Sequence, residues 1–584
     1  MHFSNRHTIP GMIAFSRLVL SVTLGLFLAL PPLVQEVQAS SRDAALAKQH
    51  MISAANPHAS RAGLLMLRAG GSAVDAAIAA ELVLSLVEPQ SSGIGGGAFM
   101  LHYQASDRSL QAYDGRETAP AAATPELFLQ ADGSPMPFWD AVVGGRAVGT
   151  PGLFRMMELA HTEHGRLPWA QLFEPAIELA EEGFKVSPRL HRLISVDPYL
   201  KTYRNARDYF YTAEGEALPV GTLLRNKPFA DVLRAVAEQG ASAFYEGAIA
   251  QDIVEAVRTV PEKPGLLALD DLKNYQARSR KMLCVSYRDW EICGMPPPTS
   301  GGVAVLQTMK MLEQFELSDL PPDSAELTHL IAEASRLAFA DRNRYLADTD
   351  FVSVPVEALL DPAYLARRAS LIQTDKSLGK AEPGLPEAEL AQTLLQTEPP
   401  STTHLSVVDQ WGNAVSMTAS VENAFGSRVM VNGFLLNNQL TDFSFRPFDD
   451  RGQAVANAVA PGKRPRSSMS PTLVLNRDKE LVMAIGSPGG SRIIGFVIKT
   501  LVASLDLDMD MQAAIEWPHR LNRNGKTDLE AGTSAEKLKV SLEKRGHEID
   551  VRAMVSGLHG IRVRGQNHLE GGADPRREGI ALGD

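Results

Sequence analysis

The chain has 584 residues, 45% of them hydrophobic, and a formal net charge of -11. This is enough apolar material for one very large core or several ordinary ones, so the composition predicts a globular protein without fixing the number of domains. The charges are spread without a basic patch, which argues against nucleic acid as the main partner and leaves small solutes.

The N-terminus has the order of a secretory signal. Arg6, His7 and Arg17 precede an apolar run over residues 18–30. Val37 and Ala39 are small residues at the two positions that cleavage requires. We interpret residues 1–39 as a cleaved signal peptide, with an uncleaved anchor as the competing interpretation. No later stretch is long and apolar enough to span a bilayer. We therefore expect a periplasmic or secreted protein that begins near Ser40, with no stable membrane insertion.

The first predicted elements after the signal are two helices and a glycine-rich turn. Helical periodicity over residues 59–69 stops at a glycine pair, and Ser72 is a suitable N-cap for a helix that runs to Val87. That helix is apolar on all sides, so it should be buried. Residues 91–97, Ser-Ser-Gly-Ile-Gly-Gly-Gly, lack the Gly-Lys-Ser/Thr ending of a phosphate loop and lead into a strand. We interpret them as a tight packed turn.

Two short strands, 98–103 and 110–113, lead to Arg116. At the boundary of a strand and a loop a guanidinium group can reach into a cleft, but an arginine with an acidic neighbour is usually a surface salt bridge. The local pattern alone favours the salt bridge.

Helical patterns dominate from Pro151 to about Leu371, interrupted by a predicted hairpin that carries the two cysteines, Cys284 and Cys293. A two-residue turn at Arg288-Asp289 would place the cysteines opposite each other. An exported compartment would permit a disulfide there, although paired cysteines can also be small buried residues, and both interpretations stay open. The chain has no CxxC or His-Glu-x-x-His spacing, so we expect no metal site.

The next stretch joins a polar segment to a strand. Residues 375–400 are polar and interrupted by prolines, which indicates an exposed, mobile segment. Ser401-Thr402-Thr403 then opens an alternating strand to Asp409, and a second strand covers 414–421. A β-branched pair at a strand start usually reflects strand propensity, so this junction alone is weak support for a catalytic threonine.

Beyond Thr402 the pattern changes to strands and glycine-bearing turns. Residues 435–443 place amides and a carboxylate after an apolar strand, residues 463–472 form a basic and then hydroxyl-rich loop, and residues 486–492 put a glycine pair before a helix over 493–503. Helices first and strands later, without regular β-α-β alternation, predict an α+β fold of stacked antiparallel sheets covered by helices. We expect the two halves to share one core.

Several of these motifs, in this order, resemble the γ-glutamyltranspeptidases (glutathione hydrolases) of the N-terminal-nucleophile hydrolase superfamily. The resemblance runs from about Ala44 to Arg577. It rests on these stretches: Gly93 to Gly97, Arg116-Glu117, Gly149 to Gly152, Pro296 to Gly302, Thr402-Thr403-His404, Asn437-Asn438-Gln439, Arg464 to Met469, and Gly486 to Arg492. It implies an αββα sandwich with two stacked, mainly antiparallel sheets. It also implies self-cleavage between Ser401 and Thr402 into a large subunit, 40–401, and a small subunit, 402–584, that remain together as a heterodimer.

The implied chemistry needs no cofactor. A freed α-amino group, with a pKa of about 7.7 to 8.0 in peptides, can take the proton of the Thr402 hydroxyl near neutral pH, whereas an amide nitrogen cannot. The hydroxyl would then attack the γ-amide of glutathione or a related donor. The resulting γ-glutamyl ester would pass to water or to the amine of an amino acid or peptide.

The resemblance also assigns the site. Gly489 and Gly490 match the oxyanion hole, and Ser420 stands where the family commonly has a threonine that supports the nucleophile. The remaining matches divide into binders of the donor's α-carboxylate and of its α-ammonium group: Arg116, Ser467 and Ser468 for the carboxylate, Asp442, Gln439 and Glu422 for the ammonium. Glu422 departs from the asparagine often found there, and the segment between Asp442 and Lys463 is shorter than in members with a long lid.

Two other functions compete with this interpretation. A glutaryl or cephalosporin acylase on the same scaffold would bind acyl groups without an α-ammonium, so Asp442 and Glu422 would face no cation. An exported solute-binding protein without catalysis would lack the nucleophile, the glycine pair or the arginine, and all three are present.

Overall fold

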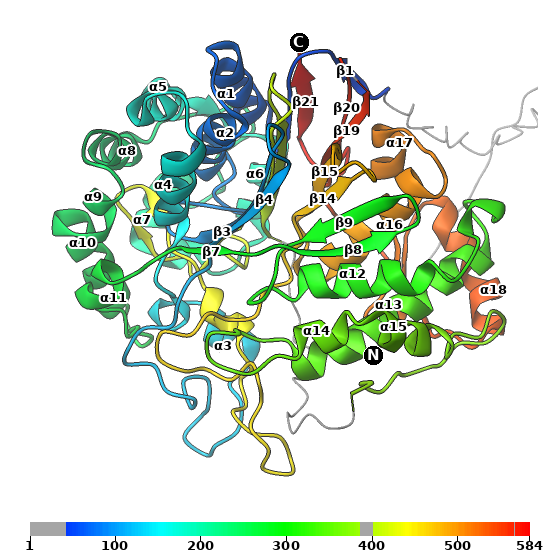
Figure 1. Cartoon of the computed structure of the whole chain (residues 1–584). Coiled ribbons are helices and arrows are strands. Elements are labelled where there is room, and N and C mark those ends of the chain that lie inside the picture. The colour runs from blue at the N-terminus through cyan, green and yellow to red at the C-terminus, as the bar shows by residue number, and fades with distance from the viewer. Residues whose placement is uncertain (1–42, 386–400, 566) are drawn as a thin grey trace, which may run out of the picture. The chain divides into compact units, whose positions relative to one another are not determined.

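Two seven-stranded antiparallel sheets face each other at the centre of the structure (Figure 1). This computed structural model describes residues 43–385, 401–565 and 567–584, so the predicted signal peptide lies outside the described residues. The first sheet has the order β21 (Ile580–Gly583), β2 (Met51–Ala54), β10 (Thr403–Val408), β11 (Ala414–Ser420), β3 (Gly97–Gln104), β4 (Ser109–Gly115), β7 (Arg278–Arg280). The second has the order β1 (Ala45–Ala47), β20 (His568–Ala573), β19 (His559–Gly565), β15 (Leu481–Gly486), β14 (Thr472–Leu475), β9 (Trp290–Gly294), β8 (Leu283–Tyr287).

Helices cover the outer face of each sheet, which completes four layers. The first sheet packs against α1 (Pro57–Arg68), α2 (Ala73–Val87) and α4 (Leu153–His164). The second packs against α12 (Gly301–Leu312), α16 (Ile493–Leu505) and α17 (Met511–Glu516), with α13 (Ala325–Tyr345) outside α12. β10 and β11 in turn contact β15 of the opposite sheet. The αββα sandwich implied by the resemblance is confirmed.

The remaining elements lie around these layers. The other helices are α3 (Phe138–Val142), α5 (Glu174–Glu182), α6 (Pro188–Val196), α7 (Arg204–Phe210), α8 (Lys227–Gln239), α9 (Ser242–Tyr245), α10 (Gly247–Arg258), α11 (Leu269–Lys273), α14 (Val356–Leu359), α15 (Pro362–Ala369) and α18 (Lys539–Lys544). Three small sheets contain β5 (Phe184–Lys185) with β6 (Leu223–Leu224), β12 (Met430–Val431) with β13 (Phe434–Leu435), and β16 (Arg520–Asn522), β17 (Thr527–Glu530) with β18 (Ile549–Arg552). None of the described helices is both long and apolar enough to cross a membrane.

The helix α2 forms as its sequence predicts. Ser72 caps it in a reciprocal capping box with Asp75, in which each side chain binds the other residue's backbone N–H. Every residue of the helix is buried, because one side packs on α1 and the other on β10 and β11. Its C-terminal end therefore delivers the glycine-rich turn to the ends of these two central strands.

The turn at residues 93–97 is packed tightly against the backbone of neighbouring segments. A Cβ atom on Gly95 would lie 2.3 Å from the Leu435 carbonyl oxygen, and one on Gly96 would lie 2.2 Å from that of Ser420. The glycines are therefore required by close backbone contact, as the interpretation of a packed turn predicts. Just before the turn, the Ser91 carbonyl oxygen accepts a hydrogen bond from the Thr402 N–H at 3.0 Å.

The predicted cysteine hairpin is β8 and β9, and a disulfide joins Cys284 to Cys293. The two residues face each other directly in the register, and Arg288-Asp289 makes the two-residue turn. Of the two interpretations left open, the structure has the disulfide. After β9 the chain runs through Pro296-Pro297-Pro298 to Ser300, which precedes α12.

Residues 375–385 make backbone hydrogen bonds to the rest of the protein, although several of them are exposed as their composition predicts. The Leu378 N–H donates to Glu333 of α13 at 2.8 Å, the Ser377 N–H donates to the Arg545 carbonyl oxygen at 2.7 Å, and the Ala381 N–H donates to Asn524 at 2.8 Å. This polar stretch is thus held against α13 and the C-terminal part of the chain by hydrogen bonds from its backbone N–H groups. The rest of the expected segment, 386–400, lies outside the described residues.

The glycine turn generates a test of packing. We expect Gly96→Ala to lower the free energy of unfolding by about 2 kcal/mol or more, because the new methyl group meets the Ser420 backbone, which cannot move without displacing β11. Gly93→Ala is the matched control, since its Cβ would have no neighbour closer than Val421 at 3.5 Å. Thermal unfolding of both variants measures the difference, and equal melting temperatures would contradict this account of the turn.

Candidate active site

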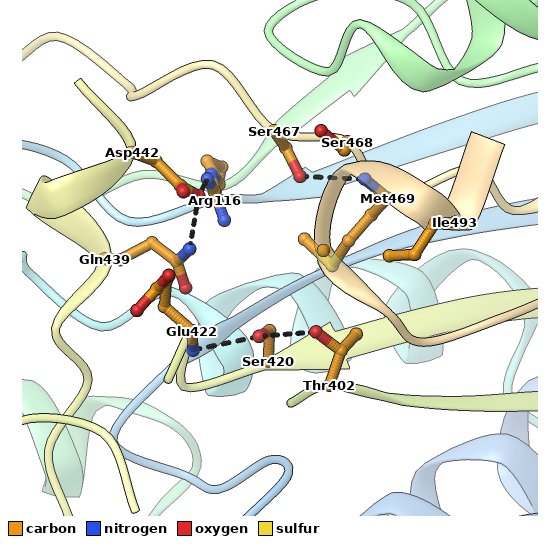
Figure 2. A pocket seen from close by; sticks show the side chains of 11 residues that line it. Arg116, Thr402, Ser420, Glu422, Gln439, Asp442, Ser467, Ser468, Met469 and Ile493 are labelled. Atoms are coloured by element: carbon orange, nitrogen blue, oxygen red, sulfur yellow. Dashed lines mark hydrogen bonds and ion pairs between the residues drawn. The ribbon is translucent and has the colours of Figure 1, made fainter. Parts of the chain in front are cut away.

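A small cavity of about 30 Å³ lies where the central strands of the first sheet end (Figure 2). Thr402 precedes β10, Ser420 ends β11, and the 3₁₀ helices Gln439–Asp442 and Gly490–Arg492 supply other walls. The lining contains nine of the predicted site residues together with two others: Arg116, Thr402, Ser420, Glu422, Gln439, Asp442, Ser467, Ser468 and Gly490, with Met469 and Ile493. Ser401 and Gly489 are next to lining residues but do not themselves line the cavity.

Hydrogen bonds hold Thr402 on three sides. Its N–H donates to Ser91, its carbonyl oxygen accepts from Arg577 Nη1 at 2.8 Å, and its hydroxyl lies 3.0 Å from the Ser420 hydroxyl. Ser420 Oγ in turn accepts from the Glu422 N–H at 2.9 Å. Because this N–H occupies an acceptor position of Ser420, the Ser420 hydrogen can point toward Thr402. Figure 2 shows the two hydrogen bonds of Ser420 as dashed lines.

The backbone of Thr402 is strained. Its φ angle is 96°, a region that β-branched residues rarely adopt because Cβ meets the backbone. Such a conformation costs on the order of 1–3 kcal/mol and persists only where the surroundings impose it. Here the bonds from Arg577 and to Ser91 do so, and the Ser401 hydroxyl donates to the Gln90 carbonyl oxygen on the other side of the same peptide bond.

Arg116 and Asp442 form a buried ion pair at the opposite wall of the cavity. Arg116 Nη2 lies 2.5 Å from Asp442 Oδ2, and Arg116 Nε donates to the Pro465 carbonyl oxygen at 3.1 Å. Gln439 Nε2 donates to the same carboxylate at 2.7 Å. The Arg116 side chain is only 1% exposed, so the surface salt bridge that the local pattern favoured is wrong. The arginine is a buried cation facing the cavity.

Glu117 lies behind this pair and does not line the cavity. Burial raises the pKa of its carboxyl group to about 8, against the opposing influence of the Arg116 guanidinium 3.7 Å away. The carboxyl group also packs against Gly97, where a Cβ atom would lie 2.7 Å from Glu117 Oε2. At neutral pH the charge balance near Arg116 is therefore set mainly by Asp442.

Ser467 and Ser468 present hydroxyl groups whose acceptor positions are used by the protein. Ser467 Oγ accepts from the Met469 N–H at 3.1 Å, and Ser468 Oγ accepts from Arg342 Nη2 at 2.6 Å. A hydroxyl that accepts from the protein keeps one hydrogen to donate. Both residues line the cavity, so these hydrogens suit an anionic group in it.

Two further acceptors lie near Asp442. The Glu422 carboxylate accepts from Asn438 Nδ2, which fixes its orientation at the cavity wall. Gln439 Oε1 is buried and accepts no hydrogen bond within the described part of the chain. The cavity thus has the Ser467 and Ser468 hydroxyls at one wall, carboxylates and an amide oxygen at another, and the Arg116 guanidinium in contact with Asp442 between them.

The glycine pair lies beyond Thr402, before α16. Gly489 and Gly490 have φ angles of 136° and 59°, and a Cβ atom on Gly489 would lie 2.6 Å from the Phe496 ring. Neither N–H donates to another group among the residues that the structure describes. Gly490 lines the cavity, so its amide is in position to serve an oxygen atom there.

The fold also brings together potential metal ligands that are far apart in sequence. His329, Glu333 and His547 place one ligand atom each within 4.8 Å of one another. His329 Nδ1 and His547 Nε2 are hydrogen-bonded at 2.7 Å, and Glu333 accepts from Arg336 at 3.0 Å. Because protein groups already use the ligand atoms and a guanidinium touches the carboxylate, this cluster fits a structural hydrogen-bond network better than a cation site.

Sequence reasoning missed Arg342, Arg577, Asn438, Met469 and Ile493. Met469 and Asn438 are in the motifs that carry the resemblance, but nothing in their residue types signals contact with the site. Arg342 is a charged residue within the long helix α13, where a local pattern gives no hint that it is buried. Its contact with Ser468 depends on the fold alone.

Comparison with known proteins identifies the family. The family model "Gamma-glutamyltranspeptidase" matches residues 59–584. The chain is 37% identical to "Glutathione hydrolase proenzyme" of Bacillus subtilis (strain 168) over 549 residues, 92% of each chain, and 35% identical to the protein of the same description from Escherichia coli (strain K12), over 94% of this chain and 93% of the relative. The crystal structure of a cephalosporin acylase from Bacillus halodurans superposes with a TM-score of 0.83 at 29% identity, covering 93% of this chain and 97% of that one. The chain belongs to the γ-glutamyltranspeptidase family.

Proposed function

We propose that this protein is a self-processing γ-glutamyltransferase that cleaves the γ-glutamyl amide of glutathione and related donors. One observation carries the proposal: the Thr402 hydroxyl shares a small cavity with a cation and two carboxylates. The γ-glutamyl group carries an α-carboxylate and an α-ammonium on one carbon, so a donor with both charges matches the cation and the carboxylates of this cavity. The descriptions of the curated relatives favour the same class of substrate.

Self-cleavage would occur between Ser401 and Thr402. The Thr402 hydroxyl attacks the Ser401 carbonyl carbon, the acyl group moves from nitrogen to oxygen, and water opens the resulting ester. The strained φ angle of Thr402 supports this step, because breaking the peptide bond releases the strain. The products are a large subunit ending at Ser401 and a small subunit beginning at Thr402, held together as a heterodimer.

Cleavage activates the nucleophile by freeing the Thr402 α-amino group. The free amine takes the proton of the Thr402 hydroxyl, which an amide nitrogen cannot do. Ser420 supports the same oxygen with its own hydrogen, held in direction by the Glu422 N–H. The uncut chain is therefore expected to be inactive.

The donor's charged end would bind between the two walls of the cavity. Its α-carboxylate would accept from Arg116 and from the hydroxyls of Ser467 and Ser468, and its α-ammonium would donate to Asp442, Gln439 Oε1 and Glu422. Arg116 and Asp442 lie next to each other, so a carboxylate and an ammonium on one α-carbon could reach both of them. The site would select an amino acid head group rather than a simple acid.

The backbone N–H groups of Gly489 and Gly490 would stabilise the oxyanion that forms when Thr402 attacks the γ-carbonyl. Each such donor typically lowers the activation barrier by about 3 kcal/mol. Collapse of the intermediate releases the amine product and leaves a γ-glutamyl ester on Thr402. Water then gives hydrolysis, and an amino acid or peptide amine gives transfer. No step needs a cofactor.

An acylase for glutaryl or cephalosporin side chains is the second candidate, favoured by the similarity to the cephalosporin acylase structure. A glutaryl group has the carboxylate but not the ammonium. The acylase would therefore use Arg116 and the two serines and give Asp442 and Glu422 no substrate ammonium group to bind. The presence of both carboxylates in the cavity is the reason to place it second.

We further expect the protein to be exported, on the strength of residues 1–39, and to act in the periplasm or outside the cell. The disulfide between Cys284 and Cys293 suits such an oxidising compartment.

Mass spectrometry of the purified protein tests self-cleavage. We expect two fragments, the smaller beginning at Thr402, and a single inactive chain for Thr402→Ala, because that variant has no hydroxyl to attack Ser401. Thr403→Ala is the matched control: the Thr403 hydroxyl is buried beside the site and makes no hydrogen bond within the described residues, so this variant should still split. Splitting of Thr402→Ala at the same bond would exclude the mechanism.

Three p-nitroanilides test the donor. The γ-glutamyl compound has both charges, the glutaryl compound has only the carboxylate, and the 4-aminobutyryl compound has only the ammonium. We expect the γ-glutamyl compound to have the highest kcat/KM, and Asp442→Asn to raise KM by about 10-fold for the two compounds with an ammonium group, since a charged hydrogen bond is lost. The glutaryl compound should change little. A wild-type preference for glutaryl would favour the acylase instead.

A further inference from the structure

Ser467 and Ser468 form one wall of the cavity, and Arg342 contacts this wall without lining the cavity itself. It belongs to α13, its side chain is 2% exposed, and it does not line the cavity. Nevertheless its guanidinium donates from Nη2 to Ser468 Oγ at 2.6 Å and from Nε to Ser300 Oγ at 2.9 Å. A buried cation therefore contacts a hydroxyl that faces the substrate cavity.

The contact with Arg342 decides which way the Ser468 hydroxyl points. A guanidinium can only donate, so Ser468 Oγ must be the acceptor in this bond, and its hydrogen is turned away from Arg342. That hydrogen is donated to no group within the described part of the chain, while Ser468 lines the cavity. The Ser468 hydroxyl is thus oriented by Arg342 so that it can donate a hydrogen bond to an anion in the cavity.

The same guanidinium controls Ser467 through Ser300. Ser300 Oγ accepts from Arg342 Nε, so its own hydrogen is free for the bond that it donates to the Ser467 carbonyl oxygen at 2.7 Å. The Ser300 N–H donates to the same oxygen at 2.8 Å. Ser467 is therefore held at its backbone, with its hydroxyl already occupied as an acceptor by the Met469 N–H. One buried arginine orients both serines.

We propose that Arg342 is a positioning residue for the carboxylate of the donor. It acts through Ser468 and Ser300, and it adds positive charge behind the hydroxyls that would bind the carboxylate. The inference rests on the proposed function only in that the acyl donor carries a carboxylate near these serines, which is true of γ-glutamyl and glutaryl groups alike. It should therefore affect binding of carboxylated donors and leave the reaction at Thr402 largely unchanged.

The three p-nitroanilides defined above measure this effect in Arg342→Gln. We expect KM to rise by about 10-fold or more for the γ-glutamyl compound, and for the glutaryl compound to the extent that it is turned over, as for the loss of a charge-assisted hydrogen bond. The corresponding kcat should change by less than about 3-fold, and the kcat/KM of the 4-aminobutyryl compound, which has no carboxylate, should stay within about 3-fold. Equal losses for all donors, or no loss for any, would overturn the proposal.

Two other variants separate positioning from general damage. Arg336→Gln removes an equally buried guanidinium from the same helix, one that contacts Glu333 and the Gly525 carbonyl oxygen and not the cavity, so it should affect all donors by the same factor. In a Ser468→Ala background, Arg342→Gln should raise KM less than it does alone, because part of its route to the substrate is already gone. A full additional effect would contradict that route.

Arg342→Lys covers the case in which the glutamine variant does not fold. Lysine keeps the charge but cannot reach both Ser468 and Ser300 with the fixed geometry of a guanidinium, so the same donor-selective rise in KM is expected at smaller size. An unselective loss in this variant would refute the proposal. If the wild-type enzyme prefers the glutaryl compound, the proposed function falls, whereas the comparison of Arg342→Gln with wild type on that compound still decides the role of Arg342.

Discussion

The antiparallel pairing that holds β10 between β2 and β11 is the constraint on which the site depends. Leu405 pairs with Ala54 on one side, and Thr403 pairs with Ala419 on the other. A strand hydrogen-bonded on both edges cannot shift by one residue without turning its buried side chains to the wrong face. The residue just before it, Thr402, is thereby fixed opposite Ser420, and the turn at residues 93–97 closes against the same strand end.

This rigidity makes the unfavourable backbone of Thr402 sustainable. An isolated peptide would leave the φ angle of 96° at once, since little opposes rotation. In the folded chain, rotation would break the bonds to Ser91 and from Arg577 and would disturb the first pairs of a central strand. The sheet therefore stores conformational energy at one peptide bond, and this is the bond whose cleavage we propose.

The fold class and several helix boundaries could be predicted from the sequence, and the family resemblance named nine of the residues that line the cavity. The Ser72 cap is a local signal, because the hydrogen bonds that form it join residues three positions apart. The partners of the charged residues could not be predicted from local pattern. Arg116 and Asp442 are separated by 326 positions, so the surface salt bridge expected for Arg116 gave way to a buried pair that only the assembled sheets create. For the same reason the contacts of Arg342 and of the cluster around His329 could not be predicted from the sequence, and composition does not reveal the backbone hydrogen bonds of residues 375–385.

In both sheets, strands from before and after Ser401 alternate across the layer. In the first sheet β10 and β11 lie between β2 and β3, and in the second a block of four later strands, β20, β19, β15 and β14, lies between β1 and β9. If the chain were cut at this position, each of the two polypeptides would contribute strands to both sheets, and strands of one would be hydrogen-bonded between strands of the other. Neither could leave without exposing unpaired strand edges on both sides of the gap, so dissociation would require a cooperative loss of structure in both sheets.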